Sequence, residues 1–574
     1  MKRLLVYLKG YKKESILSPL FKMLEASFEL LVPLVIASMI DIGIADGNLG
    51  QGDRAYIIKC FFILISLGFV GLICAVTAQY FAAKAATCFS RDLRHDLFSH
   101  LLNLNFSKID NIGTSTMITR MTADVNTIQN GVNMFLRLFL RSPFIVIGAT
   151  VMAFTIDAES ALIFVAVVVI LFIVVGLIMK SNIPMLKKVQ SKLDDVLCLT
   201  RENLSGVRVI RAFVKEDSEV LEFRDNNETL SRLQRSAGKI SGLLNPLTYV
   251  IINLAIIVLI SVGGYRASSG IITTGQVVAL YNYMSQILLE LIKFANLIVT
   301  INKALASANR ISDVFDIEEG MEGIDSASSH MDSDYAIEFD DVSLRYHEDS
   351  DESLTGVSFK LEKGKTLGII GGTGSGKTSL VSLIPRFYDA TSGRVIINGE
   401  DVKTINTDDL RNSIGIVMQK AVLFDGSIKD NLLWGNENAT DEEMMEAVRM
   451  AVAEDVVLTK GGLDSKIEAG GKNLSGGQRQ RLTIARALVR KPEILILDDS
   501  SSALDYLTDS KLRSNIKSLS YNPTVVIVSQ RTTSVADADM IIVLDDGDVV
   551  GMGTHNELLN NCDVYKEIHY SQVK

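Results

Sequence analysis

The sequence contains no tract of basic residues. Its 57 Lys and Arg residues are outnumbered by 67 Asp and Glu residues, which gives a formal net charge of −10. A protein that binds nucleic acid needs a cationic face for the phosphates. The composition therefore argues against a nucleic-acid partner.

Cysteine is also scarce, with five residues that are odd in number and widely spaced: Cys60, Cys74, Cys88, Cys198 and Cys562. No metal-ligand spacing and no disulfide framework can be drawn from them. Free cysteine usually packs as a small hydrophobic residue. We therefore expect all five to be buried.

The amino-terminal stretch, MKRLLVYLKGYKKE, lacks a small-residue cleavage site. The apolar run that follows it, Ile16–Ile44, is too long for the apolar region of a secretory signal peptide. We expect a short amphipathic helix on the cytoplasmic surface followed by a first membrane span. No peptidase or other extra domain is expected before residue 16.

Apolar residues, in contrast, are abundant: they form 48% of the 574 residues, and the mean hydropathy is +0.27. The excess lies in about the first 300 residues, where segments long enough to cross about 30 Å of hydrocarbon recur. The expected spans lie near Ile16–Ile44, Tyr56–Ala83, Phe139–Ile156, Ala161–Met179, Ile240–Tyr265 and Ile271–Ile301. In the third, Arg137 and Arg141 shorten the uncharged stretch. We predict an all-α, six-helix transmembrane domain over residues 1–311.

The charges of the connections predict how the spans are oriented. The short connections Asp41–Arg54, Asp157–Glu159 and Arg266–Gly270 are poor in Lys and Arg. The long connections Lys84–Arg137 and Lys180–Lys239 are rich in both. Because cytoplasmic loops carry the excess of positive charge, the long loops and both termini are expected to be cytoplasmic. The predicted location is the plasma membrane.

A second domain is expected after an acidic, Ser- and Gly-containing linker at residues 312–335. From residue 336 to 574, short β-branched strands alternate with helical segments. This alternation predicts an α/β domain in the cytoplasm. The length of the chain agrees, since 574 residues exceed what one hydrophobic core usually organises.

The strongest local motif is a P-loop, which follows the predicted strand Thr366–Ile370 and opens a helix. Its phosphate-contacting residues are Gly371, Gly372, Thr373, Gly374, Ser375, Gly376, Lys377, Thr378 and Ser379. Glycines allow backbone N–H groups to surround phosphates, and the lysine reaches the β- and γ-phosphates. The Thr378 hydroxyl is expected to bind Mg²⁺. The α/β domain is thus predicted to be a P-loop NTPase domain that binds ATP and Mg²⁺.

Two further motifs lie in the second half of the domain. Ile494–Asp498 reads as a buried strand that ends in a carboxylate, and Asp498 is expected to hold Mg²⁺ through water. Leu474-Ser-Gly-Gly-Gln478 directly precedes the helical run Arg479–Val489. With this signature the chain resembles the ATP-binding cassette (ABC) family. Six spans ahead of one cassette resemble the half-transporter arrangement of type IV ABC exporters over the whole chain, which implies an ATP-driven transporter and excludes a soluble cassette protein.

The resemblance also implies roles for single residues. Tyr346 matches the aromatic residue that stacks on adenine, Gln419 matches the residue that contacts Mg²⁺ and the transmembrane domain, and Asp505 closes the D-loop. Two cassettes of this family meet head to tail. The loop residues Ser475, Gly476, Gly477 and Gln478 are therefore expected to cap the γ-phosphate held by a second half-transporter.

Two cytoplasmic stretches, Phe106–Thr116 and Ser205–Phe213, resemble the regions that couple the cassettes to the spans. Short helices are expected there. Their rigid-body movement would convert closure of the cassettes into movement of the membrane helices.

Two positions depart from the family pattern: Asp499 stands where a catalytic glutamate is usual, and Gln530 stands where a histidine is usual. One methylene fewer withdraws the carboxylate by about 1.5 Å, and a misplacement near 1 Å costs on the order of 10²-fold in rate. A glutamine can orient water in other nucleotidases. Together the two changes predict a site that binds ATP but hydrolyses it slowly.

This asymmetry favours a heterodimer whose partner supplies the catalytic Glu and His, as in heterodimeric bacterial multidrug exporters, which this chain resembles. The expected cargo is an amphiphilic drug, a lipid or a small peptide. Two alternatives stay open: a homodimer in which Asp499 suffices, and an importer of the siderophore type built on the exporter fold.

Two carboxylates in the first span, Glu25 and Glu29, lie one helical turn apart and so share a face. Each costs about 2.5–3.5 kcal/mol in the middle of a bilayer. They would suit a cationic or hydrophobic cargo if they face a cavity. Alternatively, they lie near the cytoplasmic end or pair with a basic residue of another span, such as Lys293 near Glu290.

Overall fold

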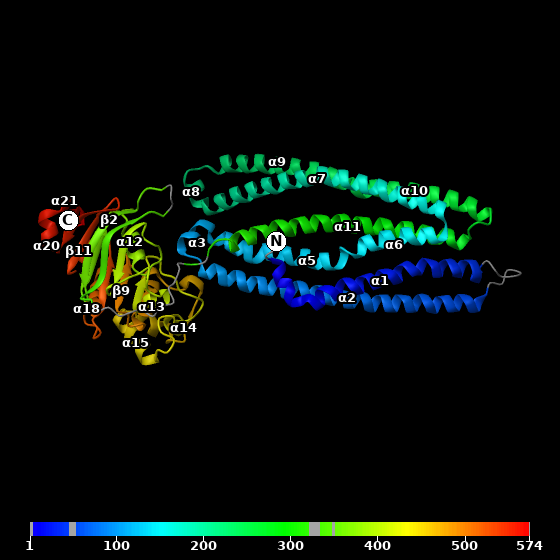
Figure 1. The fold of residues 1–574 in the computed structure, drawn as a ribbon. Coiled ribbons are helices and arrows are strands. Elements are labelled where there is room, and N and C mark those ends of the chain that lie inside the picture. The colour runs from blue at the N-terminus through cyan, green and yellow to red at the C-terminus, as the bar shows by residue number, and fades with distance from the viewer. Residues whose placement is uncertain (1–3, 45–52, 319, 321–332, 347–349, 573–574) are drawn as a thin grey trace. The chain divides into compact units, whose positions relative to one another are not determined.

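The structure is a computed structural model that describes residues 4–44, 53–318, 320, 333–346 and 350–572. The chain divides into two compact units (Figure 1). Unit 1 comprises Met1–Leu102 and Thr114–Ile317, and unit 2 comprises Asn103–Gly113 and Glu318–Lys574. The two units are described separately below.

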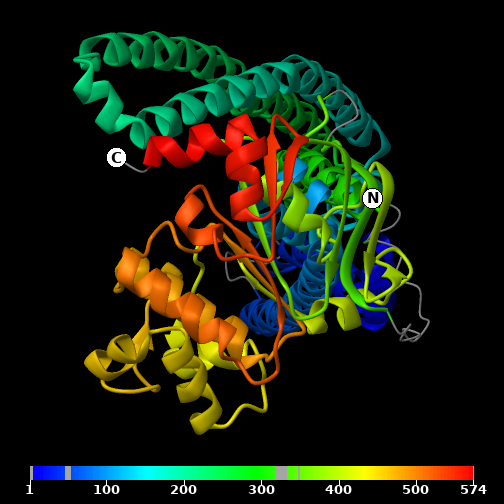
Figure 2. The ribbon, with the colours of Figure 1, turned by 90° about the vertical axis from the view of Figure 1, so that its left-hand side faces the viewer.

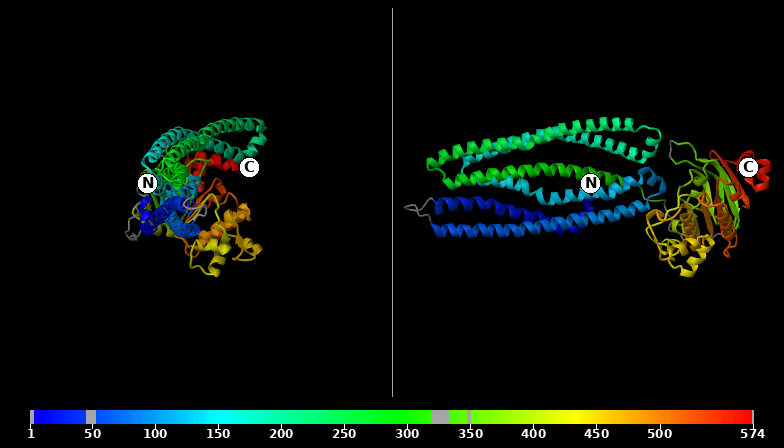
Figure 3. Two further views of the ribbon diagram at one scale, coloured as in Figure 1. Left: turned by 90° about the vertical axis from the view of Figure 1, so that its right-hand side faces the viewer. Right: turned by 180° about the vertical axis from the view of Figure 1, so that it is seen from behind.

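The described part of unit 1 contains helices and no strand, and its long helices run alongside one another (Figure 1, Figure 3). The elements are η1 (Leu4–Tyr11), α1 (Lys12–Ser38), η2 (Met39–Ile44), α2 (Arg54–Asn103), α4 (Thr114–Thr119), η3 (Arg120–Asp124), α5 (Val125–Leu138), α6 (Arg141–Ile156), α7 (Ala158–Ser205), α8 (Val207–Ala212), α9 (Glu216–Gly242), α10 (Leu244–Ser268) and α11 (Thr274–Phe315). Among the described residues, six stretches are long and apolar enough to cross a membrane. They confirm the predicted six-helix domain.

The helices extend well beyond the apolar runs that predicted them. For example, α7 contains 48 residues, whereas about 20 suffice to cross the hydrocarbon core. The third span is divided: α5 ends at Leu138, and α6 begins at Arg141 with Pro143 in its first turn. Proline is tolerated there because the first-turn N–H groups have no partner inside the helix. The helical part of this span thus begins two residues after the predicted start at Phe139.

Burial of the cysteines follows the prediction only in part. Cys60, Cys74 and Cys562 are buried and Cys88 is half-buried, but Cys198 is exposed. Cys198 lies in the last two turns of α7, where the neighbouring Leu197 is also exposed. The expectation that all five cysteines are buried was therefore wrong for Cys198.

The described residues of unit 2 form three sheets. Figure 2 shows strands and helices of this unit. The six-stranded sheet has the order β12-β11-β3-β10-β9-β6, all parallel except for β12. Its strands are β3 (Thr366–Gly371), β6 (Ile414–Val417), β9 (Ile494–Asp498), β10 (Thr524–Val528), β11 (Met540–Asp545) and β12 (Asp548–Gly553). An antiparallel sheet β2-β1-β4-β5 and a ribbon β7-β8 complete the set: β1 (Tyr335–Leu344), β2 (Leu354–Glu362), β4 (Ser392–Ile397), β5 (Glu400–Asp401), β7 (Gly426–Ser427) and β8 (Lys466–Ile467).

The strands of unit 2 alternate with helices, several of which pack on the six-stranded sheet. They are α12 (Lys377–Leu383), α13 (Thr407–Ser413), α14 (Ile428–Leu433), α15 (Asp441–Met450), α16 (Glu454–Lys460), η4 (Ala469–Gly471), α17 (Gly476–Val489), α18 (Tyr506–Lys517), α19 (Thr532–Val535), α20 (His555–Asn561) and α21 (Asp563–Gln572). The strands β3, β9 and β10 are almost fully buried, as expected for a parallel sheet covered on both faces. The α/β prediction for this domain is confirmed.

The segment predicted as a linker, residues 312–335, is shorter than expected. Helix α11 continues to Phe315, and β1 begins at Tyr335. The side chains of Ile311 and Val314 are buried, so packing extends the helix beyond the point where the apolar pattern fades. Residues 319 and 321–332 of the predicted linker lie outside the described residues.

A short segment from the first half of the chain, Asn103–Gly113, packs in unit 2. It contains α3 (Phe106–Ile112), whose amino terminus is capped by the side chain of Asn105. The ring of Phe106 lies 4.6 Å from that of Phe387, and the Tyr388 hydroxyl donates a 2.8 Å hydrogen bond to Asp110. A short helix therefore exists in the first predicted coupling region, and α8 occupies the second.

We expect Gly131→Ala to destabilise unit 1, because a Cβ at this position of α5 would lie 2.3 Å from the Cβ of Ala304 in α11. Overpacking of this kind costs about 1–3 kcal/mol. The midpoint of thermal unfolding in detergent should fall. Gly176→Ala in α7 is the matched control, since nothing lies within 4 Å of its Cβ. Equal midpoints for the two variants would contradict the close packing of α5 on α11.

Candidate nucleotide-binding site

Four adjacent parallel strands, in the order β3-β10-β9-β6, carry the predicted site residues at their carboxyl ends. The P-loop follows β3, Gln530 follows β10, Asp498 and Asp499 stand at the end of β9, and Gln419 follows β6. The carboxyl ends of parallel strands meet at one edge of a sheet, where ligands of α/β proteins bind. The fold thus brings together residues that lie far apart in the sequence.

The P-loop turn depends on glycine at two positions. Gly374 and Gly376 have φ angles of +87° and +91°, which side chains rarely adopt. A Cβ on Gly376 would also lie 2.6 Å from the carbonyl oxygen of Ser353. The loop therefore curls tightly before α12 and exposes successive backbone N–H groups to one point, an arrangement that binds anions.

The Lys377 ammonium is held at the centre of this loop. It donates to the Gly371 carbonyl at 3.0 Å, to Ser375 Oγ at 3.3 Å and to the Gly372 carbonyl. Burial lowers the pKa of Lys377, an effect that the nearby carboxylates of Asp499 and Asp498 partly offset. A buried ammonium surrounded by neutral oxygens favours an anionic ligand, because a phosphate would stabilise its charge.

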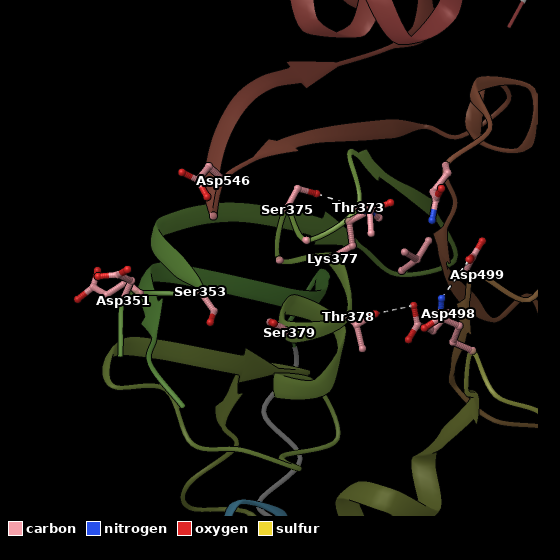
Figure 4. Close-up of a pocket in the computed structure, with 17 residues that line it drawn as sticks. Asp351, Ser353, Thr373, Ser375, Lys377, Thr378, Ser379, Asp498, Asp499 and Asp546 are labelled. Atoms are coloured by element: carbon pink, nitrogen blue, oxygen red, sulfur yellow. Dashed lines mark hydrogen bonds between the residues drawn. The ribbon is translucent and has the colours of Figure 1, made fainter. Parts of the chain in front are cut away.

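Beside the loop lies a set of oxygen atoms that suits Mg²⁺. Thr378 Oγ1 donates to Asp498 Oδ1 at 3.3 Å (Figure 4). Asp498 is 5% exposed, and burial raises its pKa, whereas the Thr378 hydrogen bond lowers it. Mg²⁺ is usually bound by one or two carboxylates together with substrate phosphates. Asp498, Thr378 and the amide oxygen of Gln419 fit such a partial set of ligands.

These residues line a cavity of about 350 Å³. Its walls are Asp351, Glu352, Ser353, Thr373, Gly374, Ser375, Gly376, Lys377, Thr378, Ser379, Gln419, Asp498, Asp499, Val528, Gln530, Asp546 and Gly547. In Figure 4, Asp351 and Asp546 lie at the end away from Asp498 and Asp499. With five acidic residues and one lysine in its wall, the cavity favours a polyanion only when a divalent cation accompanies it.

Sequence reasoning missed the wall formed by Asp351–Ser353 and by Asp546–Gly547. The second pair forms the tight turn between β11 and β12, with φ angles of +47° and +89°. The sequence signal for this turn is the Asp-Gly dipeptide between two apolar runs, which is typical of a β-hairpin. The signal predicts the hairpin but does not show that it borders the P-loop.

Asp499 occupies a strained backbone position at the end of β9. Its φ angle is +44°, and its N–H donates to the Val528 carbonyl of β10 at 3.0 Å. Gln419 Nε2 donates to Asp499 Oδ2 at 3.3 Å. The short carboxylate is therefore tied to the residue that follows β6, within the same cavity.

The backbone around Gln530 is held by the last described helix, α21. Gln572 Nε2 donates to the Gln530 carbonyl at 2.7 Å, and Gln572 Oε1 accepts from the Thr532 N–H at 2.9 Å. His569 Nδ1 lies 3.1 Å from the Thr532 hydroxyl. No motif marks Gln572, so sequence reasoning missed it as a residue that positions Gln530.

Other predicted site residues lie outside the walls of this cavity. Tyr346 is half-buried: its hydroxyl donates to Ser379 Oγ at 2.9 Å, and burial raises its pKa. The carboxylate of Asp505 caps α18 by accepting from the N–H and the hydroxyl of Thr508, which lowers its pKa. These contacts give both residues a local structural role.

The predicted loop Ser475–Gln478 also lies away from the cavity. Ser475 caps α17 in a capping box: its Oγ accepts from Gln478 N–H at 3.3 Å, and Gln478 Oε1 accepts from Ser475 N–H at 2.9 Å. Ser475 and Gly476 are exposed. A Cβ added to Gly476 would have no other atom within 4 Å, so the space beside the amino terminus of α17 is open to an approaching ligand.

The two carboxylates of the first span are paired, so the structure favours one of the interpretations that the sequence left open. Arg141 Nη2 donates to Glu29 Oε2 at 2.7 Å, and Lys22 pairs with Glu25. For Glu29 the structure shows the alternative in which a basic residue of another span provides the partner, whereas Lys22, the near partner of Glu25, lies in the same span. That partner is Arg141 of α6, whereas Lys293 pairs with Glu290.

Comparison with known proteins agrees with this architecture. Residues 15–291 match the family described as "ABC transporter transmembrane region", and residues 354–502 match the family described as "ABC transporter". The chain is 35% identical over 573 residues to "Uncharacterized ABC transporter ATP-binding protein YfiB" of Bacillus subtilis, covering 100% of this chain and 98% of that protein.

Two further relatives carry more specific names. "Putative multidrug export ATP-binding/permease protein YgaD" of Bacillus subtilis is 30% identical, and the match covers 99% of this chain and 98% of that protein. "ATP-dependent lipid A-core flippase" of Desulfotalea psychrophila is 31% identical, with 94% and 97% covered. The solved structure of a bacterial Atm1-family ABC exporter with ATP bound has the same fold, with a TM-score of 0.83, 23% identity and 98% of each chain covered.

A transmembrane helical unit joined to a P-loop unit with an LSGGQ loop defines an ATP-hydrolysing membrane transporter. The chain belongs to the ABC transporter family and has the half-transporter arrangement of its exporters.

We expect Thr378→Ala to remove most of the Mg²⁺ dependence of nucleotide binding, because the variant lacks the hydroxyl beside Asp498. Removing an oriented metal contact costs about tenfold or more in metal affinity. Titration with a fluorescent ATP analogue, with and without Mg²⁺, measures the effect. Thr378→Ser retains the hydroxyl and serves as the control. A Thr378→Ala protein with an unchanged response to Mg²⁺ would exclude this metal site.

Proposed function

We propose that this chain is one subunit of a heterodimeric, ATP-driven exporter, in which its own P-loop site binds ATP and Mg²⁺ but hydrolyses ATP slowly. The observation that carries the proposal is the short side chain of Asp499 and the contacts that fix its position. The residue has the shorter of the two acidic side chains, and its carboxylate already contacts Gln419 at 3.3 Å. Its backbone is fixed to β10 by a 3.0 Å hydrogen bond.

A general base must reach the attacking water within hydrogen-bond distance. The fixed backbone of Asp499 cannot advance to replace the missing methylene, which withdraws the carboxylate by about 1.5 Å. Gln530 lines the same cavity, but its amide neither accepts nor releases a proton near neutral pH. The site therefore retains the groups that bind ATP and has a poor set of groups for proton transfer.

The second support is the exposed loop Ser475–Gln478. Helix α17 has 14 residues, and Ser475 Oγ accepts from the Gln478 N–H, whereas the N–H groups of Gly476 and Gly477 have no acceptor within the helix. A phosphate on a second cassette is a suitable acceptor. Because this loop is intact and the chain's own site is weak, a partner that carries the catalytic Glu and His would give the complex one fast site.

Exposed apolar surface also favours a partner of the same class. In unit 2, Phe424 and Trp434 are stacked at 4.3 Å and are 43% and 63% exposed. The helix α8 in unit 1 exposes Val209, and Phe213 after it is 72% exposed. Such surfaces mark protein contacts. We assign α8 to the aromatic surface of the partner's cassette, just as α3 contacts Phe387 in this chain.

The orientation follows from the connections between the spans: the charged helical extensions and both termini lie in the cytoplasm. The cargo class is an amphiphile that enters from the membrane. The names of two relatives, a putative multidrug exporter and a lipid A-core flippase, support export of such molecules.

We expect the chain alone, in lipid nanodiscs, to bind ATP with a turnover far below about 1 s⁻¹, a usual enzyme rate. Asp499→Glu should raise turnover on the order of 10²-fold by restoring the reach of the carboxylate. Adding Gln530→His should raise it further. Turnover is measured by phosphate release, and nucleotide binding is measured in the same sample.

The matched control is Asp499→Asn, which keeps the shape of the side chain and removes its charge. It should bind ATP like the wild type and remain slow. A wild-type turnover near 1 s⁻¹ would refute the weak site and support a homodimer instead.

Phe213→Asp should uncouple ATP hydrolysis from transport in the heterodimer, because a charge cannot enter an apolar contact without a large desolvation cost. Transport of a fluorescent amphiphile into inverted vesicles should fall while ATP turnover persists. The control is Val220→Asp in α9, also at an exposed apolar residue but away from α8. Equal loss of transport in both variants would contradict a specific role for α8.

A further inference from the structure

Helix α21 holds the segment that follows β10 through two of its side chains. Gln572 Nε2 donates to the Gln530 carbonyl at 2.7 Å, and Gln572 Oε1 accepts from the N–H and the hydroxyl of Thr532 at 2.9 and 3.3 Å. His569 Nδ1 lies 3.1 Å from the same hydroxyl. Because that hydroxyl donates to Gln572, it accepts from His569, whose proton is therefore on Nδ1. His569 and Gln572 are three residues apart and so act from one face of the helix.

The segment held in this way borders the nucleotide cavity. Gln530 lines that cavity together with Lys377 and Asp499. On one side of Gln530, the buried Ser529 donates its N–H to the Ile369 carbonyl of β3 at 3.1 Å. On the other side, the peptide groups are bonded to α21. The position of Gln530 therefore depends on a strand of the central sheet and on a helix that can separate from it.

A pair of histidines anchors α21 to α20. The rings of His555 in α20 and His569 in α21 have centroids 5.3 Å apart, and His555 Nδ1 lies 2.6 Å from the Tyr565 hydroxyl. Tyr565 is fully buried, and burial raises its pKa to about 12, so the hydroxyl keeps its proton. It can donate that proton to His555 Nδ1 only while the imidazole is neutral.

The surroundings of this pair disfavour a positive charge. Burial and the neighbouring His569 lower the pKa of His555, and Asp537 partly offsets both effects. Other charged side chains on the elements that pack around the pair are Glu557 of α20, Asp563, Lys566 and Glu567 of α21, Asp548 of β12, and Arg531 and Asp539 beside α19. Of these, Glu557 is bonded to Thr554 and Lys566 to Asp563.

The lowered pKa of His555 sets the direction of the pH effect. When α21 separates, His555 loses its contacts with Tyr565 and His569 and returns toward its ordinary pKa of 6.5. The separated state then binds more protons than the docked state. Docking of α21 is therefore strongest above about pH 6.5 and weakens as the pH falls below that value.

We propose that Gln572 is a positioning residue for the nucleotide site, which fixes the backbone of Gln530, and that the His555–His569 pair weakens this hold as the pH falls. The inference rests on the proposed function and adds a form of regulation to the same site. A glutamine amide orients an attacking water only when its own backbone is fixed. Protonation of His555 removes the acceptor of the Tyr565 proton and places a charge beside His569, and both effects favour separation of α21.

The test measures phosphate release by the full chain in lipid nanodiscs, in the faster Asp499→Glu background. Gln572→Met keeps the volume of the side chain and removes its hydrogen bonds. We expect kcat to fall about tenfold, the worth of the lost hydrogen bonds, with the Kd of a fluorescent ATP analogue unchanged. The same substitution added to Gln530→Ala should cause no further loss, because the positioned side chain is then absent.

The matched control is Ser571→Ala, since the neighbouring Ser571 hydroxyl donates to the Ile568 carbonyl of its own helix. It should leave kcat unchanged. An equal loss from Gln572→Met with and without the Gln530 side chain would overturn the positioning role and make Gln572 a structural contact only.

The pH dependence is tested with His555→Asn, which keeps an acceptor near the position of Nδ1 and cannot be protonated. Between about pH 7.5 and 5.5, turnover with His555 present should fall more steeply than turnover of His555→Asn. The same acid loss in both proteins would refute the role of the histidine pair.

Hydrogen exchange of the Thr532 amide gives a second measurement that does not depend on turnover. Corrected for the intrinsic rate at each pH, exchange should be faster in Gln572→Met than in Ser571→Ala, and faster at acid pH when His555 is present. Unchanged exchange would refute the hold of α21 on this segment. None of these outcomes decides the proposed function, which is tested by the turnover of the chain with Asp499.

Discussion

The nucleotide-binding unit is organised by the need to bury opposite charges at one edge of its sheet. Lys377 and Asp498 are 9% and 5% exposed. Burial lowers the pKa of Lys377 and raises the pKa of Asp498, and so it favours the neutral form of each. Neither charge is stable alone in such a place. The sheet order places their strands on either side of β10, and the tight glycine turn orients the lysine. A nucleotide bound with Mg²⁺ supplies the missing countercharges, and so ligand binding also stabilises the folded unit.

The membrane unit meets the same constraint by a different route. Its buried charges pair with one another, with Arg141 shared between carboxylates of two other helices. In unit 2 the charges depend on a bound ligand, whereas in unit 1 they form a neutral group.

Much of the fold and part of the site could be predicted from local patterns. The six spans follow from the length of apolar runs, and Lys377, Thr378 and Asp498 follow from motifs of strand, loop and helix. Asp546 and Gly547 could not be predicted as cavity walls, because their place depends on β11 pairing with β3. Similarly, the pairing of Glu29 with Arg141 depends on which helix faces meet. The exposure of Cys198 and the contact of Gln572 with the Gln530 backbone depend on tertiary packing in the same way.

The docking of Asn103–Gly113 in unit 2 has a consequence for biosynthesis. About 200 residues separate this segment from the rest of the unit, which at about 5–20 residues per second takes on the order of 10–40 s to synthesise. During that interval the ring of Phe106 has no aromatic surface to cover it. The cassette, in turn, completes its surface around Phe387 only with a segment made long before it. Folding of unit 2 therefore depends on a segment that is synthesised within the membrane half of the chain. A cassette expressed without that segment would leave the aromatic surface around Phe387 exposed.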